Sequence, residues 1–233
     1  TDAETMEIVQ MILCGKVNKN VTSELSAMGV RAVGLSGKDN GLIRVRKKPA
    51  VGGVDYGYVG DIVSVNGDML RDMCLEDYIP VIASIGADEN GDGYNINADI
   101  AACEIGGAVG ADKLLFLTDI DGIRSDPNDP NTLIPRIDLA GIKKLMDSGA
   151  ISGGMIPKVQ SCVTAVRKGI KHVNIVNGTI SCMLTYDGNA SWAMNELGEN
   201  NTLTIAPFTN DPVQLGFDLF VVPKGAKHID LAH

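Results

Sequence analysis

Apolar runs without polar alternation recur along this chain, and segments of helical periodicity lie between them. Residues 79–85, 113–118 and 172–176 form such runs, which are typical of parallel strands covered on both faces. Apolar positions repeat at helical spacing in the intervening segments. The predicted helices cover residues 1–29, 68–76, 98–110, 138–148 and 158–169. Because strands and helices alternate, the pattern predicts an α/β fold, a three-layer αβα sandwich with a mainly parallel open sheet.

Two segments predict strands of another kind. Residues 42–47 and 56–65 are separated by Pro49 and the pair Gly52-Gly53, which favour a turn. We therefore expect them to pair antiparallel. A short strand over residues 31–36 should precede them. With 233 residues, the chain can hold one large α/β domain or two small lobes.

The stretch from Gly93 to Asp99 gathers polar side chains where an extended segment gives way to a helix. Asn95, Asn97 and Asp99 fall within five positions. Asn97 is placed to cap the helix, because its side-chain oxygen can accept a hydrogen bond from a first-turn N–H group. An anion beside Asn95 and Asn97 would also meet the positive end of the helix. A helix cap is the simplest interpretation, and a ligand site is the alternative.

A second group of features surrounds Lys158. Gly153 and Gly154 free the backbone before a predicted helix, Pro157 fixes φ near its start, and Lys158 follows in the first turn. The helix dipole disfavours a cation at this position. An anion that faced the lysine, such as a transferring phosphate, would stabilise its charge at this position. A solvated surface lysine is the structural alternative.

An Asp-Gly turn follows the strand predicted over residues 113–118. Asp119 to Gly122 lie at the carboxyl end of that strand, where open parallel sheets bind ligands. Such turns are also common in loops without a function. The sequence contains neither G-x-x-x-x-G-K-[ST] nor G-x-G-x-x-G. It therefore offers no P-loop and no dinucleotide fingerprint.

Composition narrows the function classes. The formal net charge of -9 argues against a nucleic-acid surface. No apolar stretch is long enough to span a bilayer, and the first residues are no signal peptide. Five scattered cysteines without a C-x-x-C pair suit a reducing compartment rather than disulfides or zinc. We expect a cytoplasmic protein without a resident metal site, whose chemistry uses lysine, carboxylates, amides and backbone N–H groups.

Four segments taken together resemble the acetylglutamate kinase family. They are residues 1–6 with 15–19, Tyr-Asn-Ile-Asn-Ala-Asp at 94–99, Leu-Thr-Asp-Ile-Asp-Gly-Ile at 117–123, and Ile-Ser-Gly-Gly-Met-Ile-Pro-Lys at 151–158. The resemblance runs from Thr1 to about Ile180. Other amino-acid kinases share the lysine and the nucleotide turn, but Asn-x-Asn-Ala-Asp after a tyrosine is specific to this family.

The resemblance implies ATP-dependent phosphorylation, with Mg²⁺, of the side-chain carboxylate of N-acetyl-L-glutamate, a step of arginine biosynthesis. Asn95 and Asn97 would bind acetylglutamate, Asp99 would orient two lysines, and Lys158 would stabilise the transferring phosphoryl group. The residues implied to lie against the nucleotide are Thr118, Asp119, Gly122, Ile123, Ile151, Ser152, Gly154 and Met155. Phosphoryl transfer needs positioning and charge neutralisation more than a histidine. A homo-oligomer built on dimers is also implied.

The resemblance divides the chain into parts. An acetylglutamate-binding lobe would cover residues 1–110, with its start missing, and a nucleotide-binding lobe would cover residues 111–185. The family's first strand, with a lysine and a Gly-Gly phosphate loop, would precede Thr1. Without these parts we expect the chain to be inactive as it stands. Residues 186–233 instead resemble a polyamine-binding extracellular solute-binding protein.

Two other functions stay open. A kinase for another small carboxylate, such as glutamate or aspartate, is the first, and the pair Asn95 and Asn97 argues against it. The second is a non-catalytic fusion whose tail binds a polyamine through Trp192, Asp187 and Asp218 by cation–π contact and charge pairing. Packing is the simpler role for Trp192.

Overall fold

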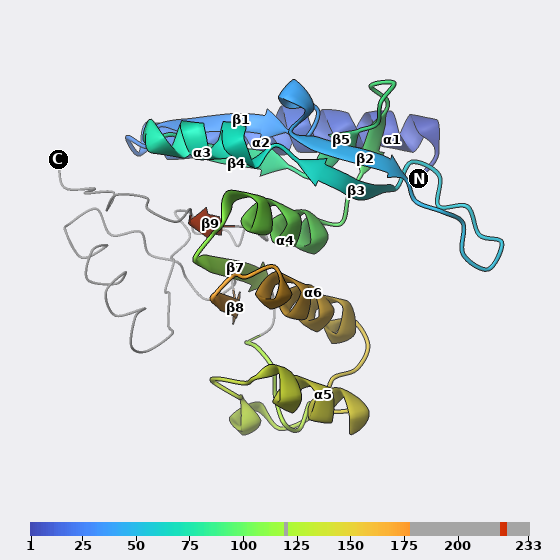
Figure 1. Cartoon of the computed structure of the whole chain (residues 1–233), viewed down its shortest axis with the longest axis vertical. Helices are drawn as coiled ribbons and strands as arrows, with labels where there is room; N and C mark the ends of the chain where they lie inside the picture. Colours follow the sequence, from blue (N-terminus) through green and yellow to red (C-terminus); the bar gives the residue numbers. More distant parts are fainter. Residues whose placement is uncertain (119–120, 178–219, 223–233) are drawn as a thin grey trace. The chain divides into compact units, whose positions relative to one another are not determined.

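The computed structural model describes residues 1–118, 121–177 and the backbone of 220–222. They form a mixed α/β fold in which the pairs β1–β4, β2–β5 and β7–β8 are parallel, and the predicted fold class is confirmed. The chain divides into two compact units, one holding Thr1–Asp112 and the other beginning at Lys113. Figure 1 shows the elements of both units in sequence colours.

A long helical segment opens the first unit. It consists of α1 (Ala3–Gln10), the π-helical η1 (Met11–Val17) and α2 (Asn18–Ala27). Asp2 caps α1, because its carboxylate accepts a hydrogen bond of 2.8 Å from the Thr5 N–H group. Gly29 has a φ of 85°, which glycine adopts without strain, and follows the last turn. The prediction of a continuing helix that stops at Gly29 is confirmed, with a π-helical turn in its middle.

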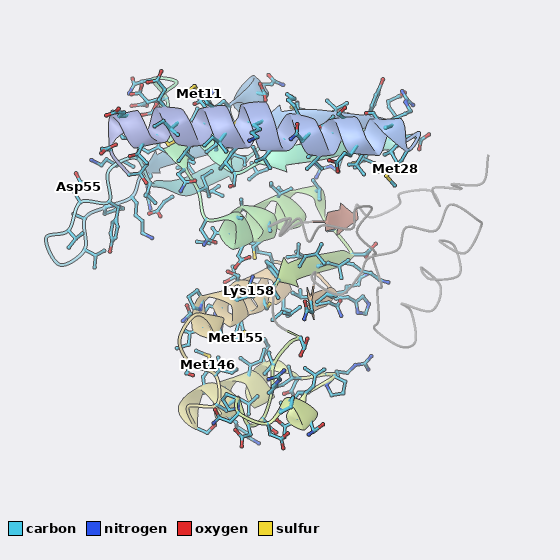
Figure 2. All side chains as sticks on the ribbon, turned by 180° about the vertical axis from the view of Figure 1, so that it is seen from behind. Met11, Met28, Asp55, Met146, Met155 and Lys158 are labelled. Atoms are coloured by element: carbon cyan, nitrogen blue, oxygen red, sulfur yellow. The ribbon has the colours of Figure 1, made fainter. Side chains whose placement is uncertain are left out.

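A parallel strand pair lies against this segment. β1 (Ala32–Ser36) pairs with β4 (Ile79–Ala83), and α3 (Gly67–Leu75) precedes β4. The buried Asn18 joins helix to strands, because its Nδ2 atom donates to the Leu35 carbonyl at 3.1 Å and to the Val81 carbonyl at 2.7 Å. Figures 1 and 2 show the long helical segment on one face of the pair and α3 on the other.

The second sheet of this unit has the order β3-β2-β5-β6. Its strands are β2 (Ile43–Lys47), β3 (Gly60–Val65), β5 (Ile85–Ala87) and β6 (Gly93–Asn95), and the short η2 (Asp39–Gly41) precedes β2. β2 and β3 are antiparallel, as predicted. The single strand predicted over residues 79–85 is wrong. The ladder breaks at Ser84, and β4 and β5 enter different sheets, with β4 only half-buried.

α4 (Ala98–Val109) completes the first unit. Its predicted apolar face is confirmed at Ala101, Ala102, Ile105 and Val109, which are buried, and Ala98 is half-buried. Gly110 ends the helix in the left-handed region with a φ of 68°. These small residues let α4 pack closely against α3, where Gly67 lies on the Ala108 carbonyl with no room for a side chain.

The second unit is built on β7 (Lys113–Thr118) and β8 (His172–Asn177), which pair in parallel from Lys113 opposite His172 to Thr118 opposite Asn177. The strand β9 (Phe220–Val222) is the other neighbour of β7. Leu114 and Phe116 are fully buried, whereas Leu115 and Leu117 are half-buried, so one face of β7 is covered and the predicted cover on the other face is incomplete. β8 is half-buried, with His172 exposed.

Helices α5 (Leu139–Asp147) and α6 (Met155–Arg167) follow the loop that contains η3 (Pro130–Thr132). Asp138 caps α5 through a hydrogen bond of 2.7 Å from the Gly141 N–H group. Ile123, Ile142, Ile151 and Val159 form one buried cluster that joins the loop and both helices. Within the described residues no helix is long and apolar enough to cross a bilayer.

Candidate functional site

The Asn95 end of the first unit is an ordered strand-to-helix junction. The Asn95 N–H group donates to the Tyr58 carbonyl at 2.9 Å, and the Ile96 N–H group donates to the Ser84 carbonyl at 3.0 Å. Asn95 also lies opposite Ile85 in the β5–β6 ladder. The backbone is thus fixed by bonds to two neighbouring segments, while the Asn95 side chain stays half-buried. The junction therefore places the Asn95 carboxamide just before the start of α4.

Asn97 caps α4. Its Oδ1 atom accepts a hydrogen bond of 3.0 Å from the Ile100 N–H group, and its φ and ψ of -60° and 127° are those of an N-cap residue. The predicted cap is confirmed. The carboxamide oxygen is therefore committed to the helix, and a ligand would meet the Nδ2 atom. Asp99 lies half-buried in the first turn that follows.

Tyr94 packs beneath this junction. It is buried, its ring centroid lies 5.6 Å from that of Tyr58, and its hydroxyl donates to the Asp88 carboxylate at 3.5 Å. Burial, together with the carboxylates of Asp88 and Asp92, raises the pKa of Tyr94 above its usual value. The phenol is therefore neutral and donates, which fixes the ring under β6.

In the second unit, the turn after β7 lies at the carboxyl end of the β7–β8 pair. Thr118 is the last residue of β7 and is paired with Asn177, the last residue of β8. Gly122 has a φ of 139°, where a β-carbon would be strained and would come within 3.2 Å of the Leu133 side chain. Ile123 then enters the buried cluster. The predicted contact residue Asp119 lies outside the described residues.

The start of α6 supplies the other predicted nucleotide contacts. Ile151 is buried in the same cluster as Ile123, and Met155 packs against that cluster. Ser152 and Gly154 are exposed. The structure thus brings Ile123 from one predicted nucleotide segment, and Ile151 and Met155 from the other, to one small core.

Lys158 is the fourth residue of α6, because the helix begins at Met155 rather than at Pro157. The Met155 and Ile156 N–H groups donate to the Ser152 and Gly153 carbonyls, both at 3.2 Å. Since proline lacks an N–H group, the first turn of α6 offers few unused donors. An anion here would be attracted chiefly by the ammonium group of Lys158. Figure 2 shows Met155 and Lys158 on α6.

The Lys158 ammonium lies over the ring of Phe116, with 5.7 Å between Nζ and the ring centroid. This distance is within the range of a cation–π contact. Phe116 is fully buried in β7, so the ring cannot move aside. The contact directs the lysine toward the strand that leads into the turn at residues 119–122.

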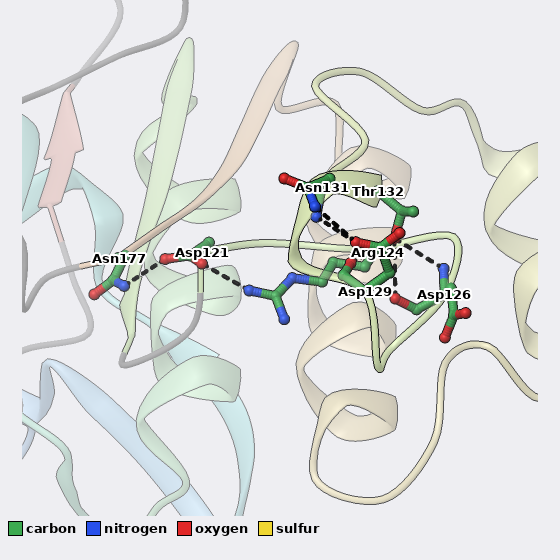
Figure 3. Close-up of polar contacts among 7 residues, drawn as sticks. All are labelled: Asp121, Arg124, Asp126, Asp129, Asn131, Thr132 and Asn177. Atoms are coloured by element: carbon green, nitrogen blue, oxygen red, sulfur yellow. Dashed lines mark hydrogen bonds and ion pairs between the residues drawn. The ribbon is translucent and has the colours of Figure 1, made fainter.

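A polar network at the same turn was not predicted from the sequence. Asp121 accepts a hydrogen bond of 2.6 Å from Asn177 Nδ2 and one of 2.8 Å from Arg124 (Figure 3). The hydrogen bond from Asn177 and then that from Arg124 hold the pKa of Asp121 below its usual value. Asn177 ends β8, and Asp121 comes three positions after the end of β7. That placement was the available signal, but their pairing across 56 positions is not visible in one sequence.

A dedicated metal site is absent from the described part of the chain, where no group of three or more His, Cys, Asp or Glu residues could hold an ion.

The predicted site residues fall into two groups. Asn95, Asn97 and Asp99 lie in the first unit, and Thr118, Gly122, Ile123, Ile151, Ser152, Gly154, Met155 and Lys158 lie in the second. The first group shares the junction of β6 and α4, and in the second group Ile123, Ile151 and Met155 share one small core. Residues 178–219 and 223–233 lie outside the described residues, and with them the tail predicted to bind a polyamine.

Comparison with known proteins finds relatives by sequence and solved structures with a similar fold. The chloroplastic acetylglutamate kinase of Arabidopsis thaliana is 48% identical over 178 residues, which cover 76% of this chain and 51% of the relative. The acetylglutamate kinase of Methanococcus aeolicus is 46% identical over 187 residues, which cover 77% of this chain and 64% of the relative. The chain therefore spans about half to two thirds of the length of these relatives.

Solved structures share the fold. The protein smu.665 of Streptococcus mutans UA159 matches with a TM-score of 0.66 and 29% identity, over 76% of this chain and 69% of its own. The N-acetylglutamate synthase of Neisseria gonorrhoeae matches with a TM-score of 0.69 at 22% identity, over 90% of this chain and 45% of its own, which supports the fold alone. The model of the amino acid kinase family matches residues 1–177. The chain belongs to the amino acid kinase family.

Proposed function

We propose that this chain carries the catalytic residues of an acetylglutamate kinase, which phosphorylates the side-chain carboxylate of N-acetyl-L-glutamate with ATP. The identity of 46–48% to enzymes of that name supports the proposal. The observation that carries it is the entrance of α6. There a half-buried lysine is held over Phe116, beside a core shared by Ile123 and Ile151.

The residues have separate roles in this proposal. Residues 1–110 form the acetylglutamate-binding lobe, in which Asn95 and the Nδ2 atom of Asn97 bind the substrate and Asp99 orients lysines. Residues 111–185 form the nucleotide-binding lobe. A carboxylate oxygen of acetylglutamate attacks the γ-phosphorus of ATP, the bond from that phosphorus to the β–γ bridging oxygen breaks, and an acyl phosphate and ADP result. Mg²⁺ accompanies ATP and neutralises its phosphates.

Lys158 acts on the charge that moves during this step. Its ammonium group stabilises the transferring phosphoryl group, and such preorganised charges act more strongly in the transition state than in the ground state. The nucleotide lies against Thr118, Asp119, Gly122 and the start of α6. A cytoplasmic location and a homo-oligomer built on dimers complete the proposal.

Activity is best tested in a chimera, because the chain spans only part of its relatives. Residues 1–177 replace the matching segment of the Methanococcus aeolicus enzyme, and ADP release is followed with ATP, Mg²⁺ and a panel of acceptors. We expect ADP release that depends on acetylglutamate. Equal rates with glutamate or aspartate would favour the kinase for another small carboxylate and would overturn the proposal.

The role of Lys158 is tested in the same chimera. Lys158→Ala should lower kcat by about two orders of magnitude, the scale for one preorganised charge, with little change in acetylglutamate affinity. Lys143→Ala removes an exposed lysine of α5 in the same unit and serves as the matched control. A loss of affinity with kcat retained would make Lys158 a ground-state contact.

A further inference from the structure

Asp121 joins the nearby Arg124 to Asn177, which lies 56 positions away along the chain. Its Oδ1 atom accepts from Asn177 Nδ2 at 2.6 Å, and its Oδ2 atom accepts from the Arg124 guanidinium at 2.8 Å. Both carboxylate oxygens are therefore used, one by the end of β8 and one by the loop that follows the turn (Figure 3). Bonds in which a charged group takes part are shorter and stronger than neutral ones. The three residues are called the Asp121 clamp below.

The Asp121 clamp lies at the carboxyl ends of β7 and β8, where the nucleotide is predicted to bind. Thr118 and Asn177 end the parallel strands β7 and β8 opposite each other. Asp121 comes three positions after Thr118, and its bond to Asn177 ties Asp121 to the end of β8. Ligands of open parallel sheets bind at this edge. The clamp thus holds Asp121 directly before the predicted contact residue Gly122.

The loop beyond the clamp is itself closed. Arg124 forms a bridge with Leu133, and the Ile134 N–H group donates to the Ile123 carbonyl at 2.8 Å. Inside it, the Thr132 hydroxyl donates to the Asp126 carbonyl at 2.9 Å and the Asp129 carboxylate accepts from the Asn131 N–H group at 2.9 Å (Figure 3). A loop with this many internal bonds moves as one piece. The Arg124–Asp121–Asn177 chain of bonds therefore fixes that piece to the sheet.

We propose that Asp121 is a positioning residue for the nucleotide, which holds the neighbouring Gly122 and Ile123 in their binding conformation through Asn177 and Arg124. This inference rests on the proposed function. Both oxygens of Asp121 already accept hydrogen bonds from protein donors, so its role is to position the backbone that follows it. Its charge also neutralises Arg124, so that this guanidinium does not compete with Lys158 for the phosphates of the nucleotide.

The experiment compares the chain as it stands with Asp121→Ala, Asn177→Ala, Asp121→Asn and the control Asp126→Ala. Asp126 lies in the same loop, and its carboxylate accepts a hydrogen bond of 2.9 Å from the Asn128 N–H group, outside the clamp. Calorimetry measures the affinity for ADP, and hydrogen exchange measures protection of the amides in residues 121–124. The midpoint of thermal unfolding shows whether each variant is folded.

We expect Asp121→Ala to weaken ADP binding about fivefold to tenfold and to speed exchange at residues 121–124 by at least a similar factor, since two hydrogen bonds are lost. Asn177→Ala should do the same to a smaller extent, and Asp121→Asn should recover part of the loss because it keeps an acceptor oxygen. Asp126→Ala should leave ADP affinity unchanged. These results together support the positioning role.

Other outcomes overturn it in distinguishable ways. Tighter ADP binding in Asp121→Ala would mean that the carboxylate only masks Arg124, and that the arginine is a direct phosphate contact. Equal ADP affinity in the unsubstituted chain and Asp121→Ala would overturn the clamp alone. An unsubstituted chain that protects residues 121–124 but has no ADP affinity would overturn the proposed function, and the nucleotide role of the clamp with it.

Discussion

The Lys158 ammonium lies 5.7 Å from the centroid of the Phe116 ring, although the two residues belong to different elements of the second unit. Phe116 is fully buried in β7, and Lys158 follows one turn into α6. The ring offers its negative face to the cation, which favours one direction of a long and otherwise flexible side chain. The contact connects the core of the unit to the group that we assign to phosphoryl transfer.

Phe116→Leu should lower kcat in the chimera about threefold to tenfold, because the lysine loses the contact that orients it, worth about 0.5–1 kcal/mol or more when partly desolvated. The KM for acetylglutamate should not change. Leu114→Val is the matched control, since Leu114 is also fully buried in β7 and, being aliphatic, offers no ring to the lysine. If both variants lower kcat equally, the effect comes from core packing and the ring has no role in orientation.

Gly34→Ala should destabilise the chain by about 1–3 kcal/mol, the usual range for overpacking. A β-carbon at Gly34 would collide with Asn18 Oδ1 and would lie 2.7 Å from Thr22 Oγ1 and 2.8 Å from Lys19 Nζ. Urea unfolding measures the change. Gly15→Ala is the control, because nothing lies within 4 Å of its β-carbon. It should be neutral or stabilise the helical segment by up to about 1 kcal/mol. Equal effects of the two substitutions would contradict this packing.

Asn97→Ala should cost about 1 kcal/mol of stability, because the first turn of α4 loses its side-chain cap. Asn97→Asp keeps an acceptor oxygen and should restore most of that stability. The aspartate has no Nδ2 donor, so acetylglutamate affinity in the chimera should stay low in both variants. An Asn97→Asp variant with full affinity would show that Asn97 serves the helix alone.

Local patterns predicted much of this structure. The cap at Asn97 and the apolar face of α4 depend on residues close in sequence, and both are confirmed. The strand β7 forms as predicted, but only the face of Leu114 and Phe116 is fully covered. Apolar periodicity could not show that the run at residues 79–85 breaks at Ser84. The break is set by pairing partners elsewhere, β1 on one side and β6 on the other. A run of apolar residues carries no information about which sheet it joins.

The candidate site was predicted in the same uneven way. Lys158 and the turn after β7 were found because each lies at the end of an element. The partners that hold them, Phe116 and Asn177, lie 42 and 56 positions away along the chain from Lys158 and Asp121, respectively. Their roles depend on the parallel register of β7 and β8 and on how α6 packs. Local composition predicts neither of these. The positions of these side chains therefore depend on tertiary contacts.

The pH dependence of stability should reveal the Asp121 clamp. Its donors, first Asn177 and then Arg124, lower the pKa of Asp121 in the folded chain, whereas the unfolded carboxyl titrates near about 3.9. The unfolded state therefore binds the proton first as pH falls, so this stabilisation is complete above about pH 4 and is lost as pH falls through the lower folded pKa. Urea midpoints of the unsubstituted chain and Asp121→Asn should differ at neutral pH and converge in acid. A difference that is constant down to the most acid pH would contradict ionised Asp121 as the acceptor.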